Sequence, residues 1–193
     1  MASPSQDKMH VYEYLAERVT YHPLTGLIYW KENPKNGVKW HCLKPAGGKT
    51  PNGYMRIGGY LNGKKVMLLQ HNLVWFMVHG ELAKDGFSLD HKNDQKSDNR
   101  LENLRTLSHT GQTIARAKGS ELPPWVHFYK PLSKFRSKVE VNRKTIHLGY
   151  FDDAWKAHVT AADYAIENGL IPGSEYAMLI VEWNQFRGGA KNV

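Results

Sequence analysis

The chain has 193 residues, of which 41% are hydrophobic and 11% aromatic, enough to bury one substantial core or two small ones. Its 26 Lys and Arg residues outnumber its 18 Asp and Glu residues, and the resulting net charge of +8 favours anionic partners such as nucleic acids or acidic membrane surfaces. No apolar run is long enough to span a bilayer, and the single cysteine, Cys42, excludes an intramolecular disulfide and a structural zinc site built from cysteines. The amino-terminal residues show no basic segment followed by an apolar one, so we expect a protein that acts in the cytoplasm.

The first half of the chain alternates short helical and extended patterns. Apolar residues at Val11, Tyr14 and Leu15 predict an amphipathic helix from His10 to Val19. The Asn62-Gly63 pair predicts a hairpin turn between two strands. The other expected elements are strands at Leu27 to Lys31, Tyr54 to Tyr60 and Lys64 to Leu69, a strand ending at Leu89, a loop from Pro34 to Gly53, and helices at His71 to His79 and Thr110 to Lys118.

The segment from Gly119 to Pro124 is predicted to be a linker, because paired prolines cannot continue a helix and hold the chain extended. Beyond it we expect strands at Trp125 to Tyr129, Lys134 to Val141 and Lys144 to Tyr150, a helix capped by Asp152 that ends before Gly169, a helix from Ser174 to Phe186, and a disordered tail from Gly188. The sequence thus predicts an α+β protein with domains at 1–118 and 125–187, a linker at 119–124 and a tail at 188–193.

Asp90 and His91 follow the strand predicted to end at Leu89 and precede Asn103-Leu104. A carboxylate can hold a hard divalent cation, and a neutral imidazole can take a proton from water. The pair is therefore suited to phosphodiester hydrolysis, with Asp90 as a metal ligand and His91 as the general base. Successive side chains of a strand point to opposite faces, so the two can serve one site only if this alternation breaks at the polar loop that begins at Lys92.

Several fragments of the chain, in their order and spacing, resemble the HNH homing endonucleases encoded by phages and introns. These fragments are Asn52-Gly53-Tyr54, His71-Asn72-Leu73-Val74-Trp75, His79-Gly80, Asp90-His91 and Asp98 to Arg105. The resemblance covers the first two thirds of the chain. It implies a ββα-metal nuclease domain that cuts DNA with Mg²⁺ or another divalent cation such as Mn²⁺, in a bacterial or phage-infected cell. It also implies that Asn103 braces the loop and orients His91 by a hydrogen bond across it.

The third residue of the family motif, a histidine or asparagine, falls on Gln112 in this chain. A glutamine carbonyl can coordinate magnesium, but its extra methylene moves the oxygen outward. The resemblance thus implies Asp90 and Gln112 as metal ligands, with a departure from the motif at Gln112. His71 and His109 are candidates for support of this site, although His71 could instead satisfy a backbone group. Asp98 and Arg100 are expected to form an ion pair that fixes the loop.

From Trp125 to about Asn168 the chain resembles the ethylene-response-factor type of DNA-binding domain, a three-stranded antiparallel sheet backed by one helix. Trp125-Val126, Lys134 to Val141 and Arg143 to Asp152 carry the resemblance. Apolar and basic residues alternate along the middle strand, which leaves a basic face suited to the major groove of double-stranded DNA. The expected DNA contacts are Lys134, Arg136, Lys138, Arg143, Lys144 and His147. The structural alternative is a sheet whose lysines only keep it soluble.

These patterns predict a monomeric, site-specific DNA endonuclease of the homing type, with one divalent metal, a histidine base and no membrane partner. Two alternatives stay open. In one, the change at Gln112 has abolished cleavage and the chain is a sequence-specific DNA-binding protein with a degenerate HNH domain. In the other, the chain is a nuclease of low specificity that processes phage DNA.

Overall fold

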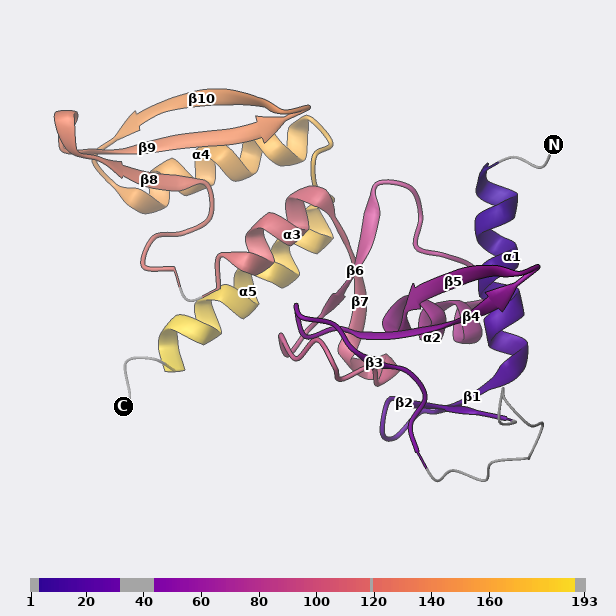
Figure 1. The fold of residues 1–193 in the computed structure, drawn as a ribbon. Coiled ribbons are helices and arrows are strands. Elements are labelled where there is room, and N and C mark those ends of the chain that lie inside the picture. The colour runs from indigo at the N-terminus through magenta and orange to yellow at the C-terminus, as the bar shows by residue number, and fades with distance from the viewer. Residues whose placement is uncertain (1–3, 32–43, 119, 190–193) are drawn as a thin grey trace. The chain divides into compact units, whose positions relative to one another are not determined.

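The computed structural model describes residues 4–31, 44–118 and 120–189, and the chain packs as two compact units (Figure 1). The first unit is Met1–Thr106 and the second is Leu107–Val193. The sequence placed Thr110 to Lys118 in the first domain, but this helix packs in the second unit, where Leu107 and Ile114 share a core with Leu179. Packing therefore divides the chain before the proline-rich segment. Cys42 and the end of the predicted tail lie outside the described residues.

The described part of the first unit is built from small β-sheets and two α-helices. Its elements are α1 (Pro4–Arg18), β1 (Val19–His22), β2 (Leu27–Trp30), β3 (Gly48–Lys49), β4 (Met55–Leu61), β5 (Lys64–Leu69), α2 (Gln70–His79), β6 (Phe87–His91), the 3-10 turn η1 (Leu101–Asn103) and β7 (Leu104–Ser108), whose last two residues belong to the second unit. The sheets have the strand orders β1-β2, β3-β4-β5 and β6-β7. Leu15, Ile28, Ile57 and Leu73 are buried together, so α1, β2, β4 and α2 share one core.

Local signals explain most of these boundaries. Asn62 and Gly63 have φ angles of 51° and 75°, as a two-residue hairpin turn requires, and they join β4 to β5 as predicted. Gly80 ends α2 in a left-handed conformation, and its N–H donates to the Phe76 carbonyl at 2.8 Å. The strand predicted to end at Leu89 continues to His91. The strand β1 was missed, because Val19 reads from the sequence as the end of a helix but pairs with β2.

The second unit contains a three-stranded antiparallel sheet and three helices. Its elements are α3 (His109–Arg116), β8 (Val126–Tyr129), the 3-10 turn η2 (Lys130–Leu132), β9 (Lys134–Val141), β10 (Lys144–Phe151), α4 (Ala154–Glu167) and α5 (Gly173–Gly189). The strand order is β10-β9-β8, and α4 covers one face of the sheet (Figure 1). Ala157, Ala161 and Ala162 are buried, since small side chains let a helix approach a sheet closely. None of the described helices is long and apolar enough to cross a membrane.

Two details of the second unit differ from the sequence expectation. Asp153 rather than Asp152 caps α4, and its carboxylate accepts the Lys156 N–H at 2.8 Å. The helix α5 continues to Gly189, so the predicted disordered tail begins as helix. Gly111 is a residue that ordinarily weakens a helix, but here it has a packing role, because a Cβ at this position would overlap the Glu175 carboxylate.

That carboxylate accepts both the N–H and the hydroxyl of Ser108, each at 2.9 Å, while the Ser108 hydroxyl caps α3 by accepting the Gly111 N–H at 2.9 Å. Glu175 lies in the first turn of α5. The start of α3 is therefore held by a side chain from α5, and glycine is the residue that leaves room for it.

Candidate functional site

His91 is the last residue of β6 and is only 4% exposed. Its Nε2 lies 3.1 Å from Oδ1 of Asn99. The His71 ring packs edge-on against it with 5.1 Å between ring centroids, and the Tyr54 ring lies 5.9 Å away. The imidazole is thus held on one side by an amide and on others by rings.

A chain of amides determines which nitrogen of a neutral His91 carries the proton. Gln70 Nε2 donates to the Ala46 carbonyl at 2.6 Å, so Gln70 Oε1 must be the atom that faces Asn99. Asn99 Nδ2 donates to that oxygen at 3.5 Å, which turns Asn99 Oδ1 toward His91. An amide oxygen only accepts, so the His91 Nε2 must donate to it. A neutral His91 then has its unprotonated nitrogen at Nδ1.

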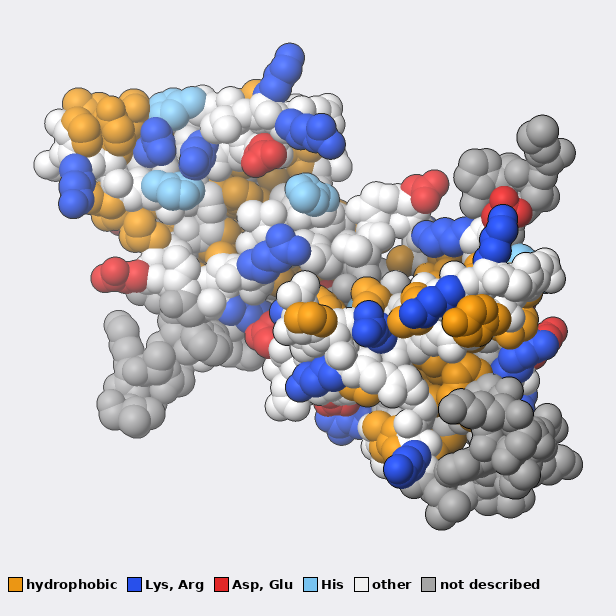
Figure 2. Space-filling view, in the orientation of Figure 1, with side chains coloured by type: hydrophobic (Ala, Val, Ile, Leu, Met, Phe, Trp, Pro, Cys, Tyr) orange, Lys and Arg blue, Asp and Glu red, His pale blue; other side chains and the backbone are white. Residues whose placement is uncertain are grey.

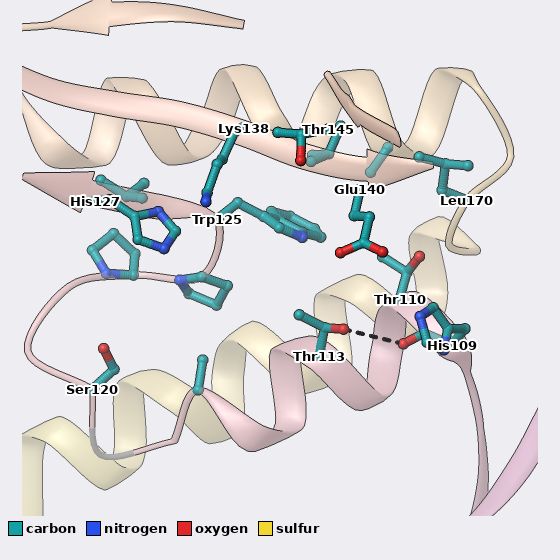
Figure 3. A pocket seen from close by; sticks show the side chains of 16 residues that line it. His109, Thr110, Thr113, Ser120, Trp125, His127, Lys138, Glu140, Thr145 and Leu170 are labelled. Atoms are coloured by element: carbon teal, nitrogen blue, oxygen red, sulfur yellow. Dashed lines mark hydrogen bonds between the residues drawn. The ribbon is translucent and has the colours of Figure 1, made fainter. Parts of the chain in front are cut away.

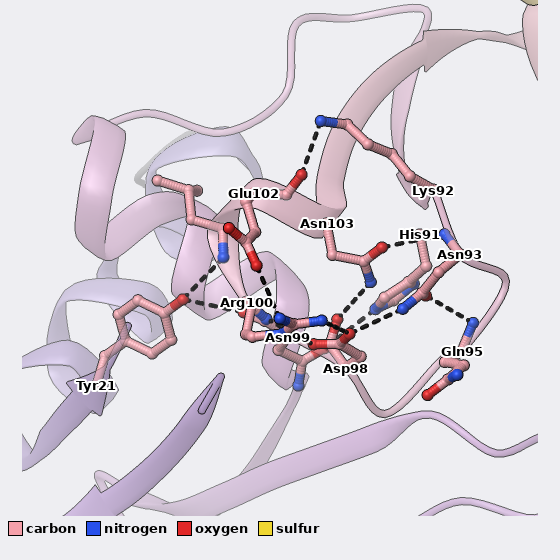
Figure 4. A network of polar contacts seen from close by, with 11 residues as sticks. Tyr21, His91, Lys92, Asn93, Gln95, Asp98, Asn99, Arg100, Glu102 and Asn103 are labelled. Atoms are coloured by element: carbon pink, nitrogen blue, oxygen red, sulfur yellow. Dashed lines mark hydrogen bonds and ion pairs between the residues drawn. The ribbon is translucent and has the colours of Figure 1, made fainter. Parts of the chain in front are cut away.

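Asn103 braces the loop that follows β6 rather than contacting His91 directly (Figure 4). Its Oδ1 accepts the Asn93 N–H at 3.0 Å, and its Nδ2 donates to the Asp98 carbonyl at 2.8 Å. The expected hydrogen bond between Asn103 and His91 is therefore wrong, because Asn99 makes the bond to His91. The physical reason is that one amide cannot close both ends of the loop and also reach the ring.

Asp98 and Arg100 form the expected ion pair. Arg100 Nε and Nη2 donate to the two Asp98 carboxylate oxygens at 2.9 and 2.7 Å. These hydrogen bonds, from Arg100 first, hold the pKa of Asp98 at about 2, below its usual value of 3.8. Tyr21 ties the same loop to the core, since its hydroxyl accepts the Leu101 N–H at 3.0 Å and donates to the Asn99 carbonyl at 3.1 Å (Figure 4).

Asp90 and His91 contact different sets of residues. The Asp90 Oδ2 accepts from Arg105 Nε at 2.9 Å, in an ion pair between β6 and β7. His91 contacts Asn99, as described above. Both residues lie within the regular strand β6, where successive side chains point to opposite faces, so the break in alternation that a shared site requires does not occur within the strand. A single site formed by Asp90 and His91 therefore stays a prediction.

The described residues offer incomplete coordination for a divalent cation. No group of three or more His, Cys, Asp or Glu side chains converges within the described ranges. Asp90 is an oxygen donor of the kind that magnesium prefers, and magnesium is commonly held by one or two carboxylates plus water and phosphate oxygens. Asp90 therefore fits as a single carboxylate ligand, with part of its charge balanced by Arg105.

His71 is the second residue of α2 and is 5% exposed. Burial, and then the neighbouring His91, lower its pKa from 6.5 to about 4. No hydrogen bond to its Nδ1 occurs among the described residues. His71 is thus a neutral ring at neutral pH and supports His91 by packing.

Gln112 and His109, the other predicted members of the site, belong to α3 in the second unit. The Gln112 Oε1 accepts from Arg116 Nη2 at 3.3 Å. The His109 carbonyl accepts from the Thr113 hydroxyl at 3.3 Å. The metal-binding role of Gln112 stays a prediction.

The face of the sheet β10-β9-β8 that α4 does not cover carries most of the predicted DNA contacts. We call it the basic sheet face: Lys134, Arg136, Lys138 and His147, with His127, Tyr129 and Tyr150 between them, and the acidic residue Glu140 near the end of β9. The register places Arg136 opposite both His127 and Tyr150, and Lys138 opposite His147. Figure 2 shows basic and histidine side chains close together on this unit.

Aromatic rings order the cations of this face. The Arg136 guanidinium lies 5.4 Å from the centre of the Tyr129 ring, and the Tyr129 and Tyr150 rings are 5.2 Å apart. Burial first, and then Lys138 and Arg136, lower the pKa of His127. Arg143 and Lys144 lie at the β9–β10 turn, where Asn142 and Arg143 have φ angles of 51° and 63°. The face is therefore positively charged without His127.

Sequence reasoning assigned no individual site role to Gln70, Asn99 or Arg105. Their sequence signals are weak, because Gln, Asn and Arg side chains are mostly exposed in proteins. All three are buried in the structure. Buried polar side chains need partners, and these partners are His91, Asp90 and one another.

Comparison with known proteins gives two matches. Residues 69–113 match the family model described as HNH endonuclease, a segment that includes Asp90, His91, Asn103 and Gln112. A solved structure described as "DNA binding and cleavage by the HNH homing endonuclease I-HmuI" is 28% identical, with a TM-score of 0.37, over 52% of this chain and 53% of that chain. The chain thus spans about half the length of that protein. Among curated proteins no match was found.

Proposed function

We propose that this protein is a site-specific DNA endonuclease of the homing type, which hydrolyses a phosphodiester with one divalent cation and His91 as general base. The observation that carries the proposal is the hydrogen bond between His91 Nε2 and Asn99 Oδ1, within the segment that matches HNH endonucleases. This bond leaves Nδ1 as the nitrogen that can accept a proton.

In the proposed mechanism, His91 Nδ1 takes a proton from the attacking water, and the ring becomes an imidazolium. Asn99 Oδ1 continues to accept from Nε2 and stabilises that positive charge. The cation, with Asp90 as a ligand and Gln112 as the second ligand predicted from the sequence, would offset negative charge on the phosphate and on the leaving oxygen. Arg105 holds the Asp90 carboxylate in one orientation.

The basic sheet face would supply the sequence specificity. Phosphodiester hydrolysis does not depend on base sequence, so sequence preference has to come from side chains that reach base edges. Arg136 and Lys138 lie on a sheet face of a kind that fits a major groove, and Arg143 and Lys144 at the turn would contact phosphates.

A plasmid nicking assay tests the proposal. Wild-type protein with supercoiled DNA and Mg²⁺ should produce relaxed circles, and a chelator should stop the reaction. His91→Ala should abolish the product, while His10→Ala, which changes an exposed histidine of α1, should leave it unchanged. Equal activity of His91→Ala and wild type would refute His91 as the base.

A second candidate is a sequence-specific DNA-binding protein whose HNH domain no longer cuts. Two observations favour it: His91 is 4% exposed, and the Asp90 carboxylate is paired with Arg105. Tight DNA binding without nicking under any divalent cation, together with cutting restored by Gln112→Asn or Gln112→His, would establish this candidate.

A further inference from the structure

The second unit contains a cleft of about 310 Å³ between α3 and the end of the sheet (Figure 3). We call it the α3 cleft; the residues used below are Thr110, Thr113, Trp125, His127, Lys138 and Glu140. This volume lies at the lower end of the range for small-molecule sites. The cleft can therefore hold one flat ring system rather than a large ligand.

Trp125 enters the cleft from an unusual backbone conformation. Its φ angle is +66°, which bulky residues rarely adopt, and such outliers concentrate at functional sites. Its neighbours hold it there: the Pro124 carbonyl lies 3.0 Å from His158 Nδ1, and the Trp125 carbonyl accepts the Lys138 N–H at 3.2 Å. The ring stacks on Tyr176 with an interplanar angle of 14°. The indole is thus presented to the cleft in a defined orientation.

The polar lining of the cleft combines both charges. Lys138 can donate hydrogen bonds and Glu140 can accept them, while Thr110 and Thr113 offer hydroxyl groups. The Glu140 carboxylate is exposed and makes no hydrogen bond to a described residue. A carboxylate in the lining disfavours a phosphate, so the ligand that fits is a neutral, flat group with donors and acceptors on its edge.

The cleft is continuous with the basic sheet face, because His127 and Lys138 belong to both. We infer that the α3 cleft binds a nucleobase, which stacks on Trp125 and hydrogen-bonds to Glu140 and Lys138. The inference rests on the proposed nucleic-acid binding by this face and names the part of the ligand that the cleft would take. The base could belong to an unpaired nucleotide of a strand lying on the face, or to a free nucleoside.

The experiment compares a short single strand that carries one 2-aminopurine with the same strand carrying an abasic site at that position. Stacking on Trp125 should quench the 2-aminopurine fluorescence, and the abasic strand should bind about tenfold more weakly. Trp125→Leu should remove this difference. Because Trp125 also packs on Tyr176, Glu140→Ala provides a second test at an exposed position, with Glu167→Ala on α4 as the matched control.

Titration with free nucleosides separates the two sources of the base. Competition by adenosine assigns the cleft to free nucleosides as well, and no competition assigns it to a base within a strand. Equal affinity for the two strands in the wild type, or a tenfold difference that survives in Glu140→Ala, overturns the inference while DNA binding stands. If no DNA binds, the proposed function fails. The inference about the cleft then stands only if nucleosides quench the tryptophan fluorescence of the wild type and do not quench that of Glu140→Ala; otherwise it fails too.

Discussion

The two units present their polar side chains in opposite ways. Around His91 the amides of Gln70 and Asn99 are fully buried and each is committed to a partner. On the basic sheet face of the second unit, Lys138 and His147 remain in contact with solvent. A buried network selects one tautomer and one geometry, whereas an exposed face acts through summed charge that salt can screen. The first arrangement suits chemistry and the second suits recognition.

The largest expected effect is a loss of nicking activity in Asn99→Ala without a loss of DNA affinity. Asn99→Ala should lower the nicking rate by about 10² to 10⁴, the usual contribution of a positioned general base, because His91 loses the partner that selects its tautomer. Single-turnover nicking at saturating protein measures this, and DNA affinity measured by gel shift should stay the same. If Asn99→Ala cuts at the wild-type rate while His91→Ala is inactive, the amide chain has no catalytic role.

The next effect is a pH dependence of stability that arises from His71, a buried residue of the first unit. The folded protein holds the His71 pKa at about 4 against 6.5 in an unfolded chain, so the unfolded state binds more protons between these values. The free energy of unfolding should therefore fall by up to about 3 kcal/mol as pH drops from 6.5 to 4. Urea denaturation across this range measures it. His71→Phe should flatten the dependence, and an unchanged slope in that variant would assign the effect to other groups.

Asp98 should add a separate loss of stability at lower pH. Its folded pKa of about 2 lies below the usual 3.8, so its contribution is present above pH 3.8 and is lost as pH falls toward 2. Asp98→Asn should remove this second phase and leave the phase assigned to His71. A single acid transition that is identical in both proteins would contradict the assignment.

A smaller effect distinguishes the two asparagines of the first unit. Asn103→Ala leaves the Asn93 N–H and the Asp98 carbonyl without their partner, so the free energy of unfolding should fall by about 1–3 kcal/mol. Urea denaturation at neutral pH measures it. At a temperature where the variant stays folded, its nicking rate should fall less than that of Asn99→Ala. The reverse order would return the orienting role to Asn103, as the sequence first suggested.

The smallest effect concerns the basic sheet face of the second unit. Lys138→Ala should reduce the slope of log affinity against log salt by about 0.9 if its amine contacts one phosphate of duplex DNA. Lys156→Ala, on the helix that covers the opposite face of the sheet, is the matched control and should leave the slope unchanged. Equal slopes for all three proteins would remove the basic sheet face from the DNA contact and leave its lysines a role in solubility.

Features that arise from neighbouring residues could be predicted before the fold was known. The hairpin at Asn62-Gly63, the end of α2 at Gly80 and the alternation along β9 follow from turn geometry, a left-handed glycine and the two-residue period of a strand. The loop-fixing pair of Asp98 and Arg100 lies only two residues apart and was also predicted. Each of these depends on a few consecutive positions, so local chemistry is sufficient.

The pairs of buried groups that meet depend on the three-dimensional packing of the chain. Gln70 and Asn99 are 29 residues apart in sequence, and Ser108 and Glu175 are 67 apart, yet each pair shares a hydrogen bond. The choice of Asn99 over Asn103 as the partner of His91, and the packing of α3 with α5, depend on such contacts. A buried polar group must find a partner wherever the fold brings one, and sequence spacing does not specify which distant residue that will be.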